Sequence, residues 1–311
     1  MAIITNTFLT FSAVGNREDL SDAIYSISPT DTPFQSMIAK AKASAVLHEW
    51  QTDSLAAAAA NAALEGDETT FQAVTPTARA QNRCQISSKS VVVSGTQDAV
   101  SKAGRKQELV YQVMKRGKEL RRDMEFILTQ NQAPAAGGAG SARQLRPLCG
   151  WYATNKSRGA GGADGTTSAA ATDGTQRALT ETLVKGMIQQ AWTAGGDPDY
   201  LMCGPFNKTV ISAFTGNSTR MQDTSDKKLV SSIDVYVSDF GTHKVVPNKF
   251  SRERDLHVLT SELWALAHLR PMQSIDLART GDAEKGLVLA EYTLEARNEA
   301  GSAIVADLTT T

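Results

Sequence analysis

Three features are scarce in this 311-residue chain, and each scarcity excludes a class of protein. There are three cysteines, Cys84, Cys149 and Cys203, with no close pair, so neither a disulfide framework nor a zinc site is expected. Aromatic residues make up only 6% and do not cluster with arginine and lysine, which disfavours a stacking platform for single-stranded nucleic acid. Excess charge is also missing, since 32 basic residues face 33 acidic ones, and this argues against a dedicated reader of duplex DNA.

Long apolar runs are absent as well. No stretch approaches the roughly 18 consecutive apolar residues of a membrane-spanning helix, so no membrane partner is expected. The residues that follow Met1 lack the basic region and long apolar stretch of a secretory signal. Together with the cysteine pattern, these absences predict a soluble protein made in a reducing compartment.

Motifs for catalysis or cofactor binding are missing. Gly117 and Lys118 are followed by Glu119 instead of serine or threonine, which excludes a phosphate-binding loop. Gly138 and Gly140 lack the third glycine of a dinucleotide fingerprint, and Gly-x-Ser-x-Gly does not occur. We therefore predict no catalytic residues and no cofactor.

Scattered histidines and cysteines do not suggest a site either. None of the four histidines has helical or strand spacing to another ligand, so no metal site is predicted; they are His48, His243, His257 and His268. Cys203, in an apolar strand before a helix, is the least implausible nucleophile. A buried cysteine acts more often as a small hydrophobic residue, and we favour that interpretation.

The N-terminal third predicts an arm followed by a hairpin. Thr5–Phe11 favours a strand, and Pro33 suits the first position of a helix that would run to about Lys42. Residues 46–93 resemble two strands, 46–55 and 78–93, around an alanine- and threonine-rich loop. This hairpin has too few apolar residues for a core of its own, so it is either a long surface loop or a projection that is buried on a neighbouring subunit. In the second case four side chains need a neighbour: Trp50, Leu55, Leu64 and Phe71.

Residues 97–130 are the clearest single element. Apolar residues recur there at spacings of three and four, which predicts one helix of roughly 51 Å. Its basic residues are more often a solvated face than a binding site. The glycine-rich residues 134–174 that follow indicate a flexible or irregular exposed loop.

The second half of the chain predicts a mixture of short helices and strands. We predict helices over 179–192 and 206–214, and strands over 200–203, 233–237, 256–259, 263–269, 287–297 and 303–308. Residues 287–297 alternate between apolar and polar side chains, as in an antiparallel strand with one buried and one wet face. Regular strand–helix–strand alternation is absent, so the fold class is α+β.

Five stretches in this order carry a specific resemblance. They are Val14–Asp22 (VGNREDLSD), Ile27–Phe34 (ISPTDTPF), His48–Leu55 (HEWQTDSL), Gly204–Lys208 (GPFNK) and Tyr292–Asn298 (YTLEARN). With an arm, a long hairpin, one very long helix and a separate α+β half, the chain resembles the major capsid proteins of tailed bacteriophages, which have the Hong Kong 97 fold.

The resemblance implies a division of the chain into segments. Residues 1–43 would be the N-terminal arm and 46–93 the extended loop across the adjacent subunit. Residues 94–174 would form a peripheral domain with the spine helix 97–130 and the glycine-rich loop 134–174. An axial domain would follow at 175–270, and residues 271–311 would return to the peripheral domain.

It also implies a function and partners. The chain would assemble into the icosahedral virion shell around double-stranded DNA as hexamers and pentamers, in the cytoplasm of the bacterial host. Because Met1 leads directly into the arm, any scaffolding protein would be separate; a portal and a decoration protein are further candidate partners, and contact with DNA would be nonspecific. Candidate intersubunit residues are Trp50, Leu55, Leu64, Phe71, Arg116 and Arg121.

Two alternatives remain open at this stage. An encapsulin-type nanocompartment shares the fold and stores enzymes instead of a genome. A cytosolic α+β enzyme would use Cys203 or a histidine.

Overall fold

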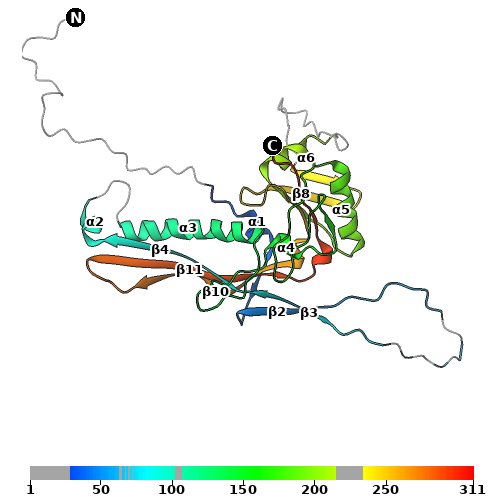
Figure 1. The fold of residues 1–311 in the computed structure, drawn as a ribbon, viewed down its shortest axis with the longest axis horizontal. Helices are drawn as coiled ribbons and strands as arrows, with labels where there is room; N and C mark the ends of the chain where they lie inside the picture. Colours follow the sequence, from blue (N-terminus) through cyan, green and yellow to red (C-terminus); the bar gives the residue numbers. More distant parts are fainter. Residues whose placement is uncertain are drawn as a thin grey trace, which may run out of the picture.

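Two halves make up the chain: an elongated one, in which a helix lies along a four-stranded sheet, and a more compact one around a six-stranded sheet (Figure 1). The computed structural model describes residues 29–62, 65–66, 68, 71, 73–101, 107–214 and 234–311. The combination of helices with largely antiparallel sheets confirms the α+β class.

The elongated half has the strand order β1-β10-β11-β4. The strands are β1 (Ala39–Lys42), β10 (Trp264–Leu277), β11 (Ala283–Ala296) and β4 (Gln85–Ser94); β1 runs parallel to β10 and the other pairs are antiparallel. Helix α3 (Glu108–Thr129) lies along one face. Its buried Leu120, Met124 and Leu128 belong to one core cluster with Val288 and Tyr292 of β11.

The long helix is shorter than the sequence predicts. A separate helix α2 (Gly95–Ala99) starts at Ser94, whose hydroxyl accepts from the Gln97 amide, and the chain is extended at Val100. Helix α3 begins where the Glu108 amide donates to Asp98 Oδ1 at 3.0 Å. The apolar spacing therefore continues across a break. The 22 residues of α3 span about 33 Å, not 51 Å.

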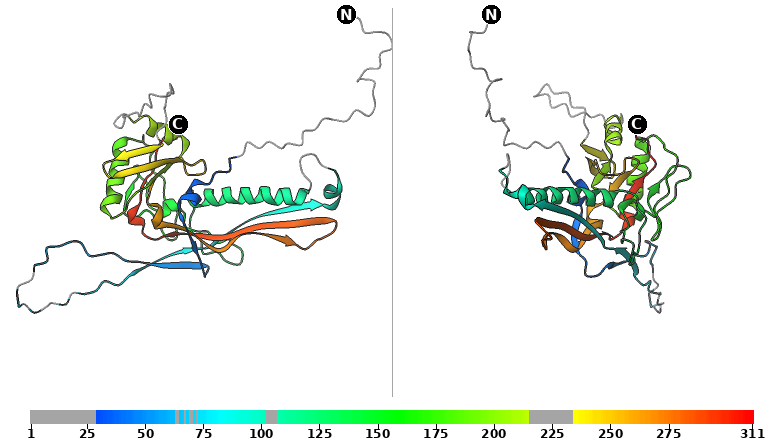
Figure 2. Two further views of the ribbon diagram at one scale, coloured as in Figure 1. Left: turned by 180° about the vertical axis from the view of Figure 1, so that it is seen from behind. Right: turned by 60° about the vertical axis from the view of Figure 1, so that its left-hand side comes forward.

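The hairpin is present at its base. β2 (Leu47–Thr52) pairs antiparallel with β3 (Ala78–Arg83), with Thr52 opposite Ala78. The predicted return strand 78–93 is two strands, because the chain turns at Cys84 and continues as β4, which pairs with β11 instead of β2. The described parts of residues 53–77 extend away from both halves of the molecule (Figure 2).

The helix after the arm also ends early. α1 (Pro33–Met37) has proline at its first position, as predicted. It stops at Met37 instead of near Lys42, because residues 39–42 extend as β1 beside β10.

The compact half has the strand order β5-β12-β9-β6-β8-β7. These strands are β5 (Lys156–Ser157), β12 (Ala303–Val305), β9 (Leu256–Leu259), β6 (Tyr200–Cys203), β8 (Gly241–Pro247) and β7 (Val235–Ser238). Helices α5 (Glu181–Thr193) and α6 (Pro205–Ser212) contribute Ile188 and Ile211 to its core. The sequence predicts all of these except β5 and β8, in which polar residues interrupt the apolar alternation.

Burial on both faces of β11 corrects the predicted wet face. Glu291 and Thr293, expected to face water, are 4% and 0% exposed. Glu291 is neutralised there by Arg143 at 2.7 Å and Arg270 at 2.8 Å. Arg143 of the glycine-rich segment and His48 and Trp50 of the hairpin base contact this end of β11, so its second face is covered as well.

The glycine-rich segment is irregular and largely exposed over 134–144 and 156–170, as predicted, but its centre is buried. Helix α4 (Leu148–Trp151) within it is buried, and so is Tyr152. Its glycines allow close approach of backbone: a Cβ on Gly159 would overlap the Thr175 carbonyl oxygen. Asp307, in the left-handed region with φ 61°, accepts from the Gly159 and Gly174 amides at 3.0 and 2.8 Å and ties the segment to the C-terminal strand.

This packing predicts that Gly159→Ala lowers the thermal unfolding temperature of the subunit. Overpacking of this kind costs about 1–3 kcal/mol. Gly140→Ala is the matched control, because a Cβ there meets nothing within 4 Å. Equal unfolding temperatures for the two variants, measured by calorimetry, would contradict the close approach.

Candidate assembly surfaces

A buried carboxylate joins three parts of the chain. Glu125 of α3 is fully buried. Its Oε1 accepts from the Phe34 amide and from Asn248 Nδ2, both at 2.7 Å. Its Oε2 accepts from the Gln35 amide at 3.1 Å and from Gln35 Nε2 at 3.0 Å. One side chain thus holds the N-terminus of α1, the helix α3 and the loop after β8.

Two opposing effects act on the pKa of Glu125. Burial raises the pKa of Glu125 above its ordinary value, while the four hydrogen bonds oppose that rise because they favour the ionised form. All four donors are amide groups, and each carboxylate oxygen receives two. No local pattern signals this contact, because the partners of Glu125 lie some 90 and 123 residues away in the sequence.

The base of the hairpin packs on its own chain, and this corrects the expectation for Trp50. The Trp50 indole donates to the Ala296 carbonyl at 2.7 Å and lies 5.5 Å from the Trp151 ring. His48 Nε2 is 3.0 Å from Glu295 Oε2. Trp50 therefore does not need a neighbour for its burial, because β2 lies against the end of β11.

The tip of the hairpin behaves differently. Leu55, Phe71 and Val74 are 98%, 94% and 92% exposed, which is nearly the full surface of each side chain. Leu64 lies outside the described residues. Val74 was not among the predicted residues, although its place in the same apolar-poor loop could have identified it.

The outward face of α3 is mixed. Val110 and Met114 are 50% and 61% exposed, and the exposed Lys115, Lys118 and Arg121 continue along the helix. Arg116 is half-buried, and its Nη1 donates to Glu119 Oε2 at 2.6 Å. Of the two arginines predicted to meet a neighbour, only Arg121 is fully on the surface.

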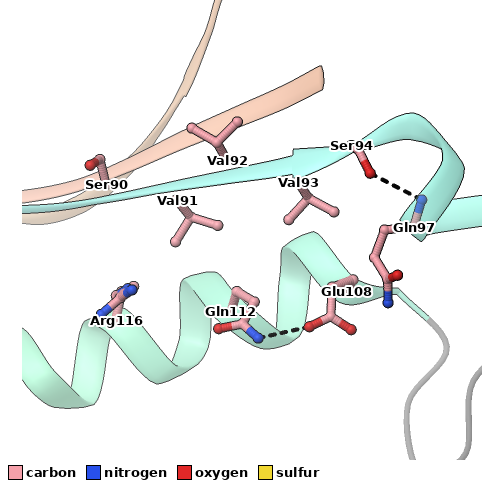
Figure 3. Close-up of a pocket in the computed structure, with 9 residues that line it drawn as sticks. All are labelled: Ser90, Val91, Val92, Val93, Ser94, Gln97, Glu108, Gln112 and Arg116. Carbon is pink, nitrogen blue, oxygen red and sulfur yellow. Dashed lines mark hydrogen bonds between the residues drawn. The ribbon is translucent and has the colours of Figure 1, made fainter. Parts of the chain in front are cut away.

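The sheet face opposite α3 carries a second apolar patch. Val91 and Val93 of β4 point toward α3, whereas Val92 points away (Figure 3). Val92 is 61% exposed, and Leu277 of β10 is 41% exposed. Lys285 of β11 is opposite both Val92 and Leu277 and lies between them. Leu287, the next β11 residue on this face, is opposite both Ser90 and Ile275 and is half-buried. This open sheet face, defined by Val92, Ile275, Leu277 and Leu287, has no cover among the described residues.

The cysteines and histidines of the described residues are mostly buried side chains. Burial raises the pKa of the Cys149 and Cys203 thiols to about 12, and that of Cys84 to about 11, so none is a ready nucleophile. Burial lowers the pKa of His257, stacked on Tyr152, to about 3. Within the described ranges, no three His, Cys, Asp or Glu side chains gather as metal ligands. None of the helices in that part of the chain has the length and apolar character needed to cross a membrane.

The junction predicts a large effect for Glu125→Gln. The new amide would direct its own hydrogens at two donors, leaving buried groups unpaired at a cost of about 1–3 kcal/mol each. We expect a clear loss of unfolding free energy in urea titrations. Glu119→Gln, which removes a partly exposed ion pair on the same helix, is the control and should cost less than about 1 kcal/mol. A Glu125→Gln variant as stable as this control would refute the role of the junction.

Comparison with known proteins agrees with this geometry. The sequence model of the SU10 major capsid protein family matches residues 3–309. The major capsid protein of Escherichia phage Phieco32 is 28% identical over 338 aligned residues, covering 96% of each chain. Among solved structures, the capsid of a native GTA particle superimposes with a TM-score of 0.65 at 8% identity, covering 96% of this chain and 98% of that one.

A second capsid structure gives the same fold. The Cyanophage A-1(L) capsid subunit has a TM-score of 0.61 at 14% identity and covers 97% of this chain and 99% of its own. The resemblance identified from the sequence is confirmed, and the family match favours a phage capsid protein over a nanocompartment. The chain belongs to the SU10 major capsid protein family and has the Hong Kong 97-type fold of tailed-phage capsid subunits.

Proposed function

We propose that this chain builds an icosahedral shell around double-stranded DNA as pentamers and hexamers, and that its role is structural instead of catalytic. The observation that carries the proposal is the exposed hairpin tip: Leu55, Phe71 and Val74 are at least 92% exposed and have no core of their own. Such side chains gain burial when a neighbour covers them, at about 1.5–3 kcal/mol for each large apolar side chain that becomes fully buried.

The open sheet face is the better receiving surface for this tip. The family resemblance implies only that the loop lies across an adjacent subunit, without saying on which surface. The outward face of α3, however, is rich in charge along Lys115, Lys118 and Arg121. The open sheet face carries the apolar side chains that define it around one lysine, Lys285, so it has fewer charges. An apolar tip loses less solvation of charged groups there. Heterologous contacts of this kind close into rings when the rotation between copies allows it.

The outward face of α3 then supports contact with the genome. α3 packs on the other face of the sheet, and its Lys115, Lys118 and Arg121 are exposed, so a loop on the open sheet face leaves this row free. Such a row meets phosphates without reading bases.

Additional partners are proposed by analogy only. One similar structure is described as major capsid proteins of phage G with decoration proteins, and another as a P4 procapsid with a size-determination protein. We propose a separate scaffolding protein, a portal and assembly in the bacterial cytoplasm, followed by incorporation into the virion. Co-purification of the shell with the products of neighbouring reading frames tests these partners, and bare shells that are stable and uniform without them would argue against a scaffold.

Replacing Ala56–Thr75 with a Gly-Ser segment of equal length tests the loop. We expect the subunit to keep its unfolding temperature, because the tip has no described contact with its own body, and to lose closed particles in electron micrographs. Leu55→Ser with Phe71→Ser should act in the same direction and raise the protein concentration needed for assembly at least tenfold.

Trp50→Ala is the matched control for this loop experiment. Because Trp50 packs on Ala296 and Trp151 of its own chain, its truncation should lower the unfolding temperature of the unassembled subunit. Normal shells from the Gly-Ser variant, or an unfolded Gly-Ser subunit, would each show that residues 56–75 are not an intersubunit loop.

The genome contact predicts a salt dependence. Replacing Lys115, Lys118 and Arg121 with glutamine should reduce the slope of log affinity against log salt by about 0.9 for each phosphate contact removed, equally for two unrelated DNA sequences. Fluorescence anisotropy with capsomers measures it. A slope unchanged by the triple substitution would exclude this face of α3.

A further inference from the structure

A carboxylate is buried without hydrogen bonds where the glycine-rich segment meets the loop between β8 and β9. It belongs to Asp255 of this loop, which is 1% exposed. Neither of its oxygens accepts a hydrogen bond from a described residue. Arg252 Nη1 lies 3.6 Å from Asp255 Oδ2, close enough for an ion pair but too far for a hydrogen bond. Asp255 therefore differs from Glu125, whose two oxygens receive four donors.

The arginines near Asp255 are held by other carboxylates. Arg252 Nη2 donates to Asp173 of the glycine-rich segment, and Arg158 Nε donates to Asp164 Oδ1 at 2.7 Å. Both of these aspartates are at least partly exposed, so water also solvates them. Each arginine thus has a carboxylate partner with better geometry, and Asp255 is left without one. An ionised carboxylate in such a buried position is costly.

The remaining neighbours do not compensate for this charge. His257, two residues further along in β9, is neutral, because burial lowers its pKa to about 3. Its ring stacks on Tyr152 of α4, with the ring centroids 5.6 Å apart. The titratable and charged groups that act on Asp255 come from its own loop, from the glycine-rich segment and from the C-terminal strand; they are Arg252, Arg158, Asp173, Asp307, Cys149 and Tyr152, with Arg254 paired to both Asp173 and Asp307.

Burial has a larger effect on Asp255 than the nearby arginines have. It raises the pKa of Asp255 from 3.8 to about 6, although Arg252 and Arg158 oppose the rise. Because the pKa is higher in the folded than in the unfolded chain, the folded subunit binds this proton more tightly. The stability that the proton contributes is therefore fully present below about pH 4. It is lost as the pH rises from about 4 to 6 and is absent at neutral pH.

We propose that Asp255 is a proton-binding site that makes the joint between the glycine-rich segment and the β8–β9 loop pH-sensitive, closed when the proton is bound and opening more readily at neutral pH. A neutral carboxyl group suits the buried position and keeps an oxygen toward Arg252. The joint connects the two halves of the molecule, because α4 also packs in the core of the elongated half through Cys149 and Tyr152 (Figure 1). The inference concerns the single subunit and does not depend on the proposed shell.

Hydrogen exchange of the full-length, unassembled subunit tests the proposal with Asp255→Asn, which keeps the side-chain shape and removes the charge. Peptides covering 148–152 and 251–257 are followed by mass spectrometry in both proteins at the same pH, so that the intrinsic exchange rate and the titration of other groups cancel. We expect slower exchange in the variant at pH 7.5, and a ratio between the two proteins that shrinks about tenfold by pH 5. Equal or faster exchange in the variant at pH 7.5, or a ratio independent of pH, would overturn the proposal.

Glu253→Gln is the matched control, because it removes an exposed carboxylate from the same loop. We expect it to leave the exchange of both peptides unchanged at pH 7.5 and at pH 5. If Glu253→Gln slowed exchange as much as Asp255→Asn, the loss of any acidic charge would tighten the joint, and the assignment to Asp255 would be wrong. An Asp255→Asn subunit that fails to fold would also contradict the proposal, since the substitution is expected to stabilise the joint at neutral pH.

Discussion

The hydrogen-bonded carboxylate of Glu125 holds the architecture together. It fixes the start of α1 to the middle of the molecule, at the point where the elongated half meets the loop that follows β8 of the compact half. A buried carboxylate is costly unless every lone pair is used, and here two donors reach each oxygen. Because α1 is anchored there, β1, which follows it, joins β10 at a defined position.

Some surfaces of the molecule are covered by other parts of the same chain, and others are left exposed. The base of the hairpin is covered in this way, because it contacts the end of β11 through Trp50, His48 and Asn82. Three other surfaces have no such cover among the described residues: the hairpin tip beyond Thr52, the open sheet face and the free edge of β4. Large exposed apolar patches mark interaction sites, so three uncovered surfaces on one subunit indicate binding to other molecules. A shell subunit repeats each contact by symmetry, and this explains why they occur together.

Local patterns predicted local structure well. β6 (Tyr200–Cys203) was predicted to the residue from four apolar side chains before Gly204-Pro205. α5, predicted over 179–192, spans Glu181–Thr193, within two residues at each end. Where the outcome depended on contacts outside the local pattern, the prediction was wrong. The spacing of apolar residues could not reveal that Asp98 caps a new helix at Glu108. Composition could not reveal that the glycines around Gly159 are sites of close packing, because flexible loops and tight backbone contacts use the same residue.

The candidate assembly surfaces could also be predicted only in part. That the hairpin lacks a core of its own follows from its composition, and Leu55 and Phe71 are as exposed as this implies. Trp50 was misassigned because its partners, Ala296 and Trp151, lie at least 100 residues away. Glu125 was missed entirely, since a single glutamate in a charged helix looks solvated until α1 is placed over it.

The central claim is that the hairpin tip, exposed on one subunit, is buried by another in a closed shell. Electron cryomicroscopy of particles assembled from the purified full-length protein tests it most directly. We predict closed shells in which Leu55 and Phe71 of each subunit lie on a neighbouring subunit, while Trp50 keeps its contact with Ala296 of its own chain. A folded protein that remains monomeric at every concentration, or shells in which the tip folds back on its own chain, would contradict the claim.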